Sequence, residues 1–462
     1  MNKSIDKNKK VEMRVLDPSF RRHNIEEVSL GYNDEEAFVE ASRCLNCKNK
    51  PCMEGCPVNI DIPSFIHYIK EGKLNEALKV IEEESSLSSV CGRVCPQESQ
   101  CEKNCVRGIK GEALAIGRLE RYVSDKVKNE INVIDIKKNG KKVAIIGSGP
   151  SGLSCSYDLI KKGYDVTIFE ALHLNGGVLM YGIPEFRLPK KIVIEEIEKL
   201  KNLGVKFINN CVIGKTLLLK DLMEEFDAIF IGSGAGLPRF MNIKGENLNG
   251  VLSANEFLTR FNLMKAYEEN SKTPIFRAKK YVVVGGGNVA MDAARCALRL
   301  GASEVHIVYR RSMNELPARY EEVIHAQEEG ILFDCLVLPV EIIGDANHYV
   351  SKINCVRMEL GEEDESGRRS PVEIPNSLFS IDCDAVIMAI GTSPNPLLKE
   401  TSDGFSTNKR GCIVVDEETL ETSLDNVYAG GDAVTGAATV ILACGSGKKA
   451  ARSIDERLRI EK

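Results

Sequence analysis

Long apolar runs are scarce in this sequence. The longest, VAII, YVVV and AVIMAI, are far shorter than the ~20 residues with which a helix spans a bilayer. The first ten residues, MNKSIDKNKK, also lack the apolar segment of a secretory signal. These absences argue against a membrane partner, and we expect a cytoplasmic protein.

Extended basic blocks are also missing. The formal net charge is −6, and lysines gather only in short groups such as KNKK. A nucleic-acid partner requires a basic surface that neutralises phosphates. The composition therefore argues against nucleic-acid binding.

Cysteine, by contrast, is abundant. Sixteen cysteines occur in 462 residues, and half of them lie between Cys44 and Cys105. In a long chain without a secretion signal, thiols are expected to stay reduced, which disfavours a disulfide framework. The other eight cysteines are scattered, as small buried side chains are. The length accommodates roughly three domains of ~150 residues.

The N-terminal cysteines form two groups with the spacing of a metal site. The first follows C-x2-C-x4-C-x3-C-P and the second C-x3-C-x5-C-x3-C. Zinc sites favour paired C-x2-C knuckles, whereas closely spaced cysteines with a Cys-Pro step are typical of [4Fe–4S] sites. Two iron–sulfur clusters fit better than two zinc ions, which are the alternative. The cysteines are Cys44, Cys47, Cys52 and Cys56, then Cys91, Cys95, Cys101 and Cys105.

Helical periodicity surrounds these cysteines. The stretches IPSFIHYIKEG, LNEALKVIEEES and EALAIGRLERYVSDKV carry apolar residues at helical spacing. The sequence therefore predicts a small α-helical domain over residues 1–139, held together by its clusters.

A dinucleotide-binding fingerprint follows at KKVAIIGSGPSGLSCSYDLIKKGYDVTIFE. An apolar strand leads into a glycine turn, a helix and a second strand that ends in an acid. The glycines permit the tight turn, the approach of a pyrophosphate and close helix packing, and the acid suits a ribose hydroxyl. The predicted residues are Gly147, Gly149, Pro150, Ser151, Gly152 and Glu170.

A second fingerprint occurs at KKYVVVGGGNVAMDAARCALRLGASEVHIVYRR. Its second strand ends in two arginines rather than an acid. A guanidinium pair binds the 2′-phosphate of NADP through charge-assisted hydrogen bonds, so NADPH is favoured over NADH. The predicted residues are Gly285, Gly287, Asn288, Val289, Ala290, Arg310 and Arg311.

Two further strand–glycine turns lie near the C-terminus, in AVIMAIGTSPN and NVYAGGDAVTGAATVILA. They contribute Gly391, Gly431, Asp432 and Thr439, and a Gly-Asp pair of this kind closes over a flavin in proteins with two dinucleotide-binding domains. The second fingerprint lies between these turns and the first, so one domain is inserted into the other. We predict an FAD domain from 140–270 and 376–462, and an NADPH domain from 271–375. The expected hinges are KAYEENSKTPIFRAKK and GEEDESGRRSPVEIP.

With these motifs in hand, almost the whole chain resembles the small (beta) subunit of NADPH-dependent glutamate synthase. It is similar also to the large subunit of NADH-dependent ferredoxin:NADP oxidoreductase and to the N-terminal part of dihydropyrimidine dehydrogenase. Further segments that carry the resemblance are GGVLMYGIPEFRLPK, GLPRFMNIKGENLNGVLSANEFL and YRRSMNELPAR. The resemblance implies an α/β fold: a helical N-terminal iron–sulfur domain followed by two Rossmann-like domains, the NADPH domain inserted into the FAD domain.

The resemblance also implies ligands. One cluster, expected nearer the FAD, takes Cys44, Cys47, Cys52 and Cys105. The outer cluster takes Cys56, Cys95 and Cys101, with Glu120 in place of the glutamine of dihydropyrimidine dehydrogenase. Cys91 is then left without iron, although its spacing alone makes it the competing ligand. The loop with Gly177, Met180 and Arg187 is implied to lie over the flavin.

The implied reaction is hydride transfer from NADPH to FAD, followed by single-electron transfer through two [4Fe–4S] clusters, with no catalytic acid or base required from the protein. The expected partner is the large flavoprotein chain of glutamate synthase. The alternatives are an electron-bifurcating subunit, working with a smaller FAD/[2Fe–2S] chain and ferredoxin, and a stand-alone NADPH oxidoreductase. A zinc-stabilised nucleotide-binding scaffold is the non-catalytic alternative.

Overall fold

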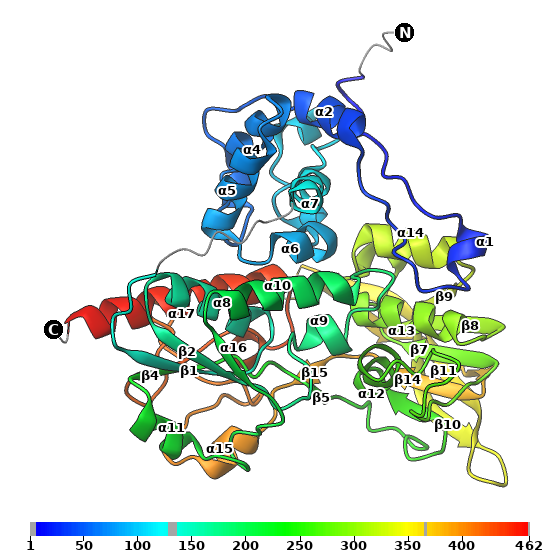
Figure 1. Cartoon of the computed structure of the whole chain (residues 1–462). Helices are drawn as coiled ribbons and strands as arrows, with labels where there is room; N and C mark the ends of the chain where they lie inside the picture. Colours follow the sequence, from blue (N-terminus) through cyan, green and yellow to red (C-terminus); the bar gives the residue numbers. More distant parts are fainter. Residues whose placement is uncertain (1–5, 128–135, 365–366, 461–462) are drawn as a thin grey trace.

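The computed structural model describes residues 6–127, 136–364 and 367–460. Figure 1 shows a helical domain above two sheet-based domains that lie next to each other. Residues 1–5 and 128–135 of the predicted first domain, and residues 365–366 of a predicted hinge, lie outside the described residues. The fold class predicted from the sequence is confirmed.

The helical domain is built from short helices between the cysteine groups. The three helices predicted from periodicity are confirmed as α4, α5 and α7. An N-terminal arm carrying α1 reaches across to the second sheet domain, where Arg21 pairs with Glu329 at 3.1 Å. The helices are α1 (Pro18–Arg21), α2 (Asp34–Ser42), α3 (Pro51–Glu54), α4 (Ile62–Lys70), α5 (Leu74–Glu84), α6 (Ser88–Val94) and α7 (Ile116–Lys126), with 3₁₀ turns at Gln97–Ser99 and Val106–Ile109.

The first sheet is parallel, with strand order β16-β4-β1-β2-β3. Helices cover both faces of this sheet, so its central strand β1 is buried. A continuous apolar run such as that of β1 is typical of a strand buried on both faces. The strands are β1 (Lys142–Ile146), β2 (Asp165–Phe169), β3 (Lys206–Ile208), β4 (Ala228–Ile231) and β16 (Val427–Ala429); the helices are α8 (Pro150–Lys161), α9 (Val178–Tyr181), α10 (Lys190–Asn202), α11 (Leu219–Glu225), α15 (Leu397–Thr401), α16 (Asp432–Thr435) and α17 (Val440–Ile460).

The second sheet is also parallel, with order β6-β14-β7-β8-β9. Two of its strands, β6 and β14, lie outside the range 271–375 predicted for this domain, because AVIMAI pairs with β7 rather than with the first sheet. The strands are β6 (Val251–Ser253), β7 (Lys280–Val284), β8 (Glu304–Tyr309), β9 (Leu332–Cys335) and β14 (Ala385–Met388); the helices are α12 (Ala254–Leu258), α13 (Asn288–Arg299) and α14 (Tyr320–Glu328), with a π-helical turn at Thr259–Leu263 and a 3₁₀ turn at Met313–Glu315.

The chain crosses between the sheet domains at a small antiparallel pair, β5 (Leu237–Pro238) with β15 (Thr392–Ser393). The hinges expected at residues 265–280 and 361–375 are therefore wrong. Both lie within the second domain, and the second one falls in an antiparallel hairpin of the outer sheet. That sheet comprises β10 (Val337–Gly344), β11 (Val350–Glu363), β12 (Arg369–Glu373) and β13 (Phe379–Asp382).

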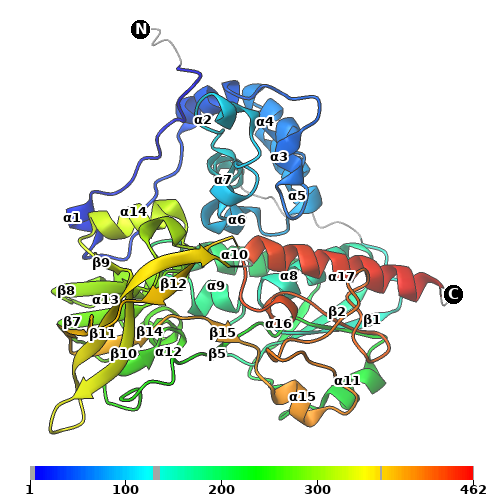
Figure 2. The same cartoon turned by 180° about the vertical axis from the view of Figure 1, so that it is seen from behind.

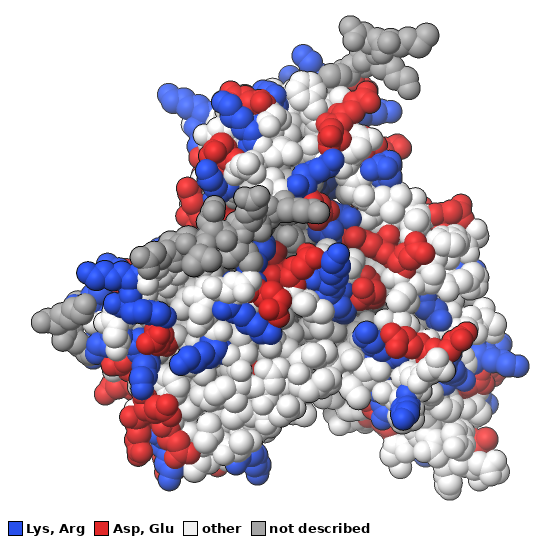
Figure 3. All heavy atoms as spheres, in the orientation of Figure 1, with Lys and Arg blue, Asp and Glu red and all other residues white. Residues whose placement is uncertain are grey.

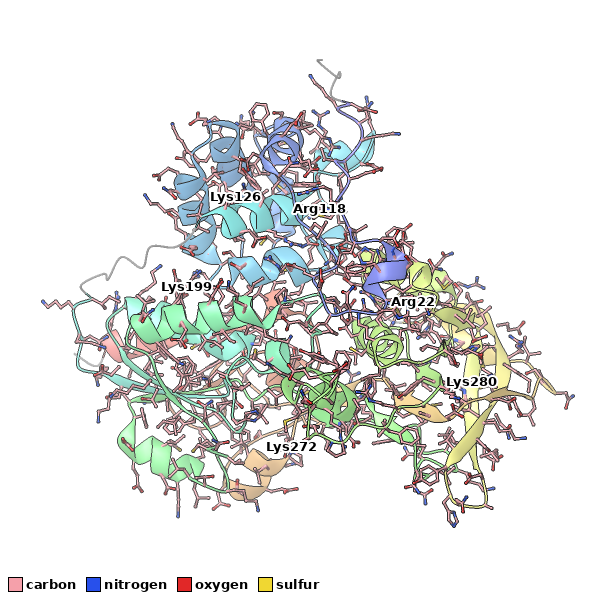
Figure 4. The ribbon with its side chains drawn as sticks, turned by 45° about the vertical axis from the view of Figure 1, so that its right-hand side comes forward. Arg22, Arg118, Lys126, Lys199, Lys272 and Lys280 are labelled. Carbon is pink, nitrogen blue, oxygen red and sulfur yellow. The ribbon has the colours of Figure 1, made fainter. Side chains whose placement is uncertain are left out.

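The helical domain is docked firmly on the first sheet domain. Buried apolar side chains of α4, α6 and α7 form one continuous core with those of β1, α8 and α17, and Figure 2 shows α17 running along this side. An ion pair borders this contact, with Lys199 on α10 3.9 Å from Glu82, and Arg118 on α7 lies 3.5 Å from Glu321 on α14 of the second sheet domain. Figure 4 labels both basic residues, and Figure 3 shows acidic and basic groups interspersed around the junction.

Candidate functional site

The first glycine turn joins β1 to α8. Gly147 has φ +100°, and a Cβ there would lie 2.5 Å from the Gly232 carbonyl oxygen. A Cβ on Gly152 would lie 2.1 Å from the Gly147 oxygen, so this position keeps helix and strand in close contact. At Gly149 nothing lies within 4 Å of a Cβ position. The N-terminus of α8 therefore faces open space, where its backbone amides and dipole favour a phosphate.

Glu170 follows β2 and lies beside this turn. Its buried carboxylate accepts hydrogen bonds from the Ser148 amide at 2.9 Å and from the Leu172 amide at 2.8 Å. The hydroxyl of Ser148 in turn accepts a hydrogen bond from the Gly176 amide at 3.0 Å. Ser148 thus connects the acid to the following loop, a role that the fingerprint pattern did not single out.

Two segments distant in sequence close over the same turn. Gly177 has φ +53°, and a Cβ there would lie 2.8 Å from the Cα of Gly149. From the C-terminal part, a Cβ on Gly431 would lie 2.9 Å from the Ser151 hydroxyl. Each contact leaves no room for a side chain, which explains glycine at both positions.

Further predicted residues surround these contacts. Met180 of α9 is buried, and Thr439 precedes α17, where its hydroxyl accepts a hydrogen bond from the Leu442 amide at 3.4 Å. Asp432 begins α16 and accepts a hydrogen bond from the Ala438 amide at 3.2 Å, while burial raises the pKa of its carboxyl group to about 6. Asp432 follows Gly431, which contacts Ser151 of the first turn, and Met180 lies 2.7 Å from a Cβ position on Gly176.

The second glycine turn joins β7 to α13 and repeats this geometry. Gly285 has φ +137°, and a Cβ would lie 2.3 Å from the Ala389 oxygen, whereas Gly287 again faces open space. The Asn288 side chain accepts a hydrogen bond from the Arg319 amide at 2.9 Å. The remaining predicted residues differ in exposure and position. Ala290 is buried, Val289 is exposed, and Gly391, with φ +105°, lies in the segment after β14.

The two arginines after β8 are not equivalent. Arg310 is exposed and makes no hydrogen bond or ion pair to the described residues, which leaves its guanidinium available to a ligand. Arg311 is buried, lies 2.6 Å from Asp364 and donates to the Arg369 carbonyl at 2.8 Å. The expectation that both bind a 2′-phosphate therefore fits Arg310 only.

Arg187 does not lie free over a flavin. Its buried guanidinium donates to Asp292 of α13 at 2.6 Å and lies 3.1 Å from Glu322 of α14. These partners hold the pKa of Arg187 above its ordinary value. The loop after α9 is thus tied to the second sheet domain by a buried ion-pair network, which the sequence does not predict because the partners are distant.

The first group of proposed cluster ligands lines one pocket. Cys44, Cys47, Cys52 and Cys105 line one pocket, and apolar side chains such as Ile62 form most of the remaining wall. Burial and the neighbouring thiols raise the pKa of Cys52 to about 12. A bound metal cluster would supply the positive charge that thiolates need here.

The second group lies deeper. Burial raises the pKa of Cys56 and of Cys101, whereas the neighbouring Cys91 and then burial raise the pKa of Cys95. The nearby Glu120 carboxylate adds to each effect. Glu120 is itself buried, and its Oε1 atom has no hydrogen-bond partner among the described residues. An unpartnered buried carboxylate oxygen beside three thiols fits a metal ligand. Within the described ranges, no three His, Cys, Asp or Glu side chains are arranged closely enough to hold a single metal ion directly.

The order of the two groups is the reverse of the expectation. A Cβ on Gly445 of α17 would lie 3.2 Å from the carbonyl oxygen of Pro57, the residue after Cys56. Helix α17 also packs on α8, where Cys444 contacts the Pro150 carbonyl at 3.8 Å. The Cys56 group therefore lies on the side of the first glycine turn. The pocket of the Cys44 group includes no residue of either sheet domain.

Comparison with known proteins agrees with this geometry. Residues 21–131 match the family described as dihydropyrimidine dehydrogenase domain II with a 4Fe-4S cluster, and residues 141–447 match the pyridine nucleotide-disulphide oxidoreductases. The chain belongs to the pyridine nucleotide-disulphide oxidoreductase family. It combines this oxidoreductase fold with an N-terminal domain of a 4Fe-4S family.

Within this family, the glutamate synthase [NADPH] small chain of Escherichia coli is 34% identical over 97% of this chain and 98% of the relative. The NADP(+)-dependent formate dehydrogenase subunit beta of Moorella thermoacetica is 42% identical over 88% of this chain, which spans 60% of that relative. The NADPH-Fe(3+) oxidoreductase subunit beta of Geobacter sulfurreducens is 39% identical, and this chain spans 65% of its length.

Solved structures share the fold of the two sheet domains. Mycobacterium tuberculosis FprA in complex with NADPH superposes with a TM-score of 0.59 at 20% identity, covering 69% of this chain and 85% of that one. Thioredoxin reductase of T. acidophilum gives a TM-score of 0.51 at 21% identity, with 69% and 99% covered. No helix in the described part of the oxidoreductase is long and apolar enough to cross a membrane.

Proposed function

We propose that this oxidoreductase takes electrons from NADPH and delivers them to a partner flavoprotein subunit, in the manner of a glutamate synthase small chain. The mutual coverage with such chains, 97% and 98% in the Escherichia coli case, supports this role. When bound, FAD accepts a hydride from NADPH, and [4Fe–4S] clusters carry electrons one at a time.

The observation that carries the proposal is the serial arrangement of the two cysteine groups. Pro57, which follows Cys56, contacts Gly445 of α17, and the neighbouring Cys444 contacts Pro150 at the start of α8; both contacts support an inner position for the Cys56 group. The Cys44 group lies farther out, and its pocket borders Leu45, which is 51% exposed. Ile109, in the 3₁₀ turn after Cys105, is 77% exposed. These exposed apolar side chains near the outer thiols would contact a docked electron acceptor.

A second candidate follows from the higher identity to subunits with other named acceptors. The formate dehydrogenase and NADPH-Fe(3+) oxidoreductase subunits are 42% and 39% identical to this chain. They support a role in which the same NADPH and cluster sites serve a different partner. Electron bifurcation and stand-alone activity stay predictions.

Anaerobic affinity purification from the native host, followed by native mass spectrometry and flavin typing, tests the proposal. Co-purification of a large FMN-containing chain, with NADPH oxidation that depends on glutamine and 2-oxoglutarate, is the expected result. A complex with formate dehydrogenase activity would establish the second candidate instead. A smaller FAD/[2Fe–2S] partner with ferredoxin-linked activity would establish the bifurcating alternative.

A pair of variants tests the direction of electron transfer. Cys47→Ala removes a proposed ligand of the outer group, so the variant should keep NADPH-dependent reduction of a small dye near the flavin but lose reduction of the partner. The matched control is Cys335→Ala, which removes a half-buried thiol from β9 in the second sheet domain. Equal partner reduction in both variants would contradict an exit through the Cys44 group.

A further inference from the structure

We propose that Lys190 is a positioning residue whose ammonium group holds the segment of residues 177–189 in one conformation, which sets how the two dinucleotide sites face each other during hydride transfer. This inference rests on the proposed function, in which FAD binds at the first glycine turn and NADPH at the second. Lys190 itself takes no part in the chemical step.

The segment of residues 177–189 joins the two sites. At its start, Gly177 packs against the first glycine turn, since a Cβ there would lie 2.8 Å from the Gly149 Cα. Near its end, the buried Arg187 pairs with Asp292 at 2.6 Å, and Asp292 belongs to α13, the helix that begins at the second glycine turn. The conformation of the segment therefore contributes to the spacing between the two turns.

Lys190 lies directly after this segment, and its side chain turns back onto it. It is the first residue of α10 and is 8% exposed. Its Nζ atom donates hydrogen bonds to three carbonyl oxygens of the segment, at 2.8 Å to Leu179, at 3.3 Å to Leu188, and to Ile183. An ammonium group has three N–H donors, so each donor has an acceptor. Because the acceptors lie near the start, the middle and the end of the segment, one side chain fixes its fold.

The position is otherwise unfavourable for a lysine. The helix dipole repels a positive charge at the first residue of a helix, and burial removes the hydration of an ammonium group. Burial lowers the pKa of Lys190 to about 8, so the group keeps its proton at neutral pH and can donate all three hydrogen bonds. The side chain of the adjacent Lys191 is 86% exposed and lies 3.8 Å from Glu195. Two neighbouring lysines of one helix therefore differ, because one faces the segment and the other faces solvent.

A second side chain holds the same segment from the second sheet domain. Asn262 lies in the π-helical turn Thr259–Leu263 and is 4% exposed. Its Nδ2 atom donates to the carbonyl oxygens of Tyr181 at 3.2 Å and Gly182 at 3.1 Å. The main chain of the segment is thus bound by one polar side chain from each sheet domain.

Removing the ammonium group should misplace the nicotinamide and flavin rings relative to each other without emptying either site. Methionine keeps a long unbranched side chain but lacks the charge and the donors. Since a misplacement of about 1 Å can slow a positioned reaction by about 100-fold, the rate constant of flavin reduction by NADPH in Lys190→Met should fall by about 10- to 100-fold. The KM for NADPH should stay within a few-fold of wild type, because the second glycine turn is unchanged.

The experiment compares Lys190→Met with its matched control Lys191→Met in the full chain loaded with FAD. Flavin content and melting temperature are measured first, followed by anaerobic single-turnover reduction of the flavin and steady-state reduction of an artificial acceptor. Hydrogen–deuterium exchange reports on the segment itself, in the FAD-free and in the loaded protein. Residues 179–188 should exchange faster in Lys190→Met than in wild type, and Lys191→Met should match wild type in every readout.

A merely stabilising contact would lower the melting temperature and leave the reduction rate per bound flavin unchanged, so an unchanged rate in Lys190→Met overturns the inference. Unchanged exchange of the segment also overturns it, and so does loss of FAD from the folded variant, because Lys190 would then retain the cofactor rather than position it. If Lys190→Met does not fold, Asn262→Leu decides. This variant removes the other two hydrogen bonds to the segment, so flavin reduction should slow by a smaller factor, and an unchanged rate overturns the inference.

The flavin content of the wild-type protein tests the assignment of the first glycine turn separately. A wild-type protein that binds no FAD would refute the proposed flavin site, whatever the Lys190 variant does. The identity of the partner subunit affects none of these readouts, because the artificial acceptor replaces it.

Discussion

Cofactor selectivity should depend on Arg310 and not on Arg311. Only Arg310 is exposed and without a partner among the described residues, whereas Arg311 is held by Asp364 at 2.6 Å and by the Arg369 carbonyl at 2.8 Å. Replacing each arginine by glutamine removes the charge and keeps a polar side chain of similar length. The two variants therefore form a matched pair.

A hydrogen bond to a charged group contributes about 1.5–3 kcal/mol. Its loss in Arg310→Gln should raise the KM for NADPH by roughly 10- to 150-fold, towards the lower end because the site is exposed. The KM for NADH and the kcat should stay close to wild type, since NADH lacks the 2′-phosphate. Steady-state reduction of an artificial acceptor with both nucleotides measures this.

Arg311→Gln should instead lower the melting temperature, because it leaves the partly buried Asp364 without its partner, and should leave the ratio of the two KM values within a few-fold of wild type. The reasoning is refuted if Arg311→Gln abolishes the preference for NADPH while Arg310→Gln retains it. Such a result would mean that Arg311 leaves Asp364 when the nucleotide binds.

Three further predictions concern the remaining contacts. Arg187→Ala leaves its carboxylate partners buried and uncompensated, so it should lower the free energy of unfolding, measured in urea, by about 3–5 kcal/mol. The control Arg260→Ala, which removes an exposed ion pair, should lower it by less than about 1 kcal/mol. Gly149→Ala should fold normally but lose FAD, and Gly287→Ala should raise the KM for NADPH, because each methyl group enters the open space before a helix N-terminus. The flavin content of the first variant and the NADPH kinetics of the second measure these effects. Unchanged cofactor binding in both variants would contradict the assignment of the two turns. The pKa of Asp432 is raised from 3.8 to about 6. Its contribution to the stability of the flavin-free protein is therefore full below about pH 4 and is lost as the pH rises through about 6. Asp432→Asn should remove this pH dependence of the melting temperature between pH 4 and pH 6.

The glycine turns could be predicted because their requirements are local. Gly147 and Gly285 need positive φ directly after a strand, and Gly149 and Gly287 need open space before a helix. Such requirements appear in the sequence as a pattern. The same holds for the helices between the cysteine groups, whose apolar faces have a regular period.

The errors concern contacts between distant segments. Arg187 pairs with Asp292, 105 residues away in the sequence, and the sequence around either residue does not predict this ion pair. The sequence of β14 is an apolar run that could belong to either parallel sheet. Only its pairing with β7 shows that it belongs to the second sheet. Which cysteine group lies nearer the first glycine turn depends on how α17 packs against Pro57. The spacing of cysteines within each group carries no information about this contact.

Helix α17 has a consequence for biosynthesis. It follows every other described element in the chain, yet it packs on α8 and supplies Cys444 and Gly445 to the contact with the helical domain. The cysteine groups leave the ribosome before α17, so the surface that covers the inner group is made after its thiols. Because domains tend to fold as they emerge, iron insertion has an interval in which the Cys56 group is still uncovered, and that interval ends when α17 docks.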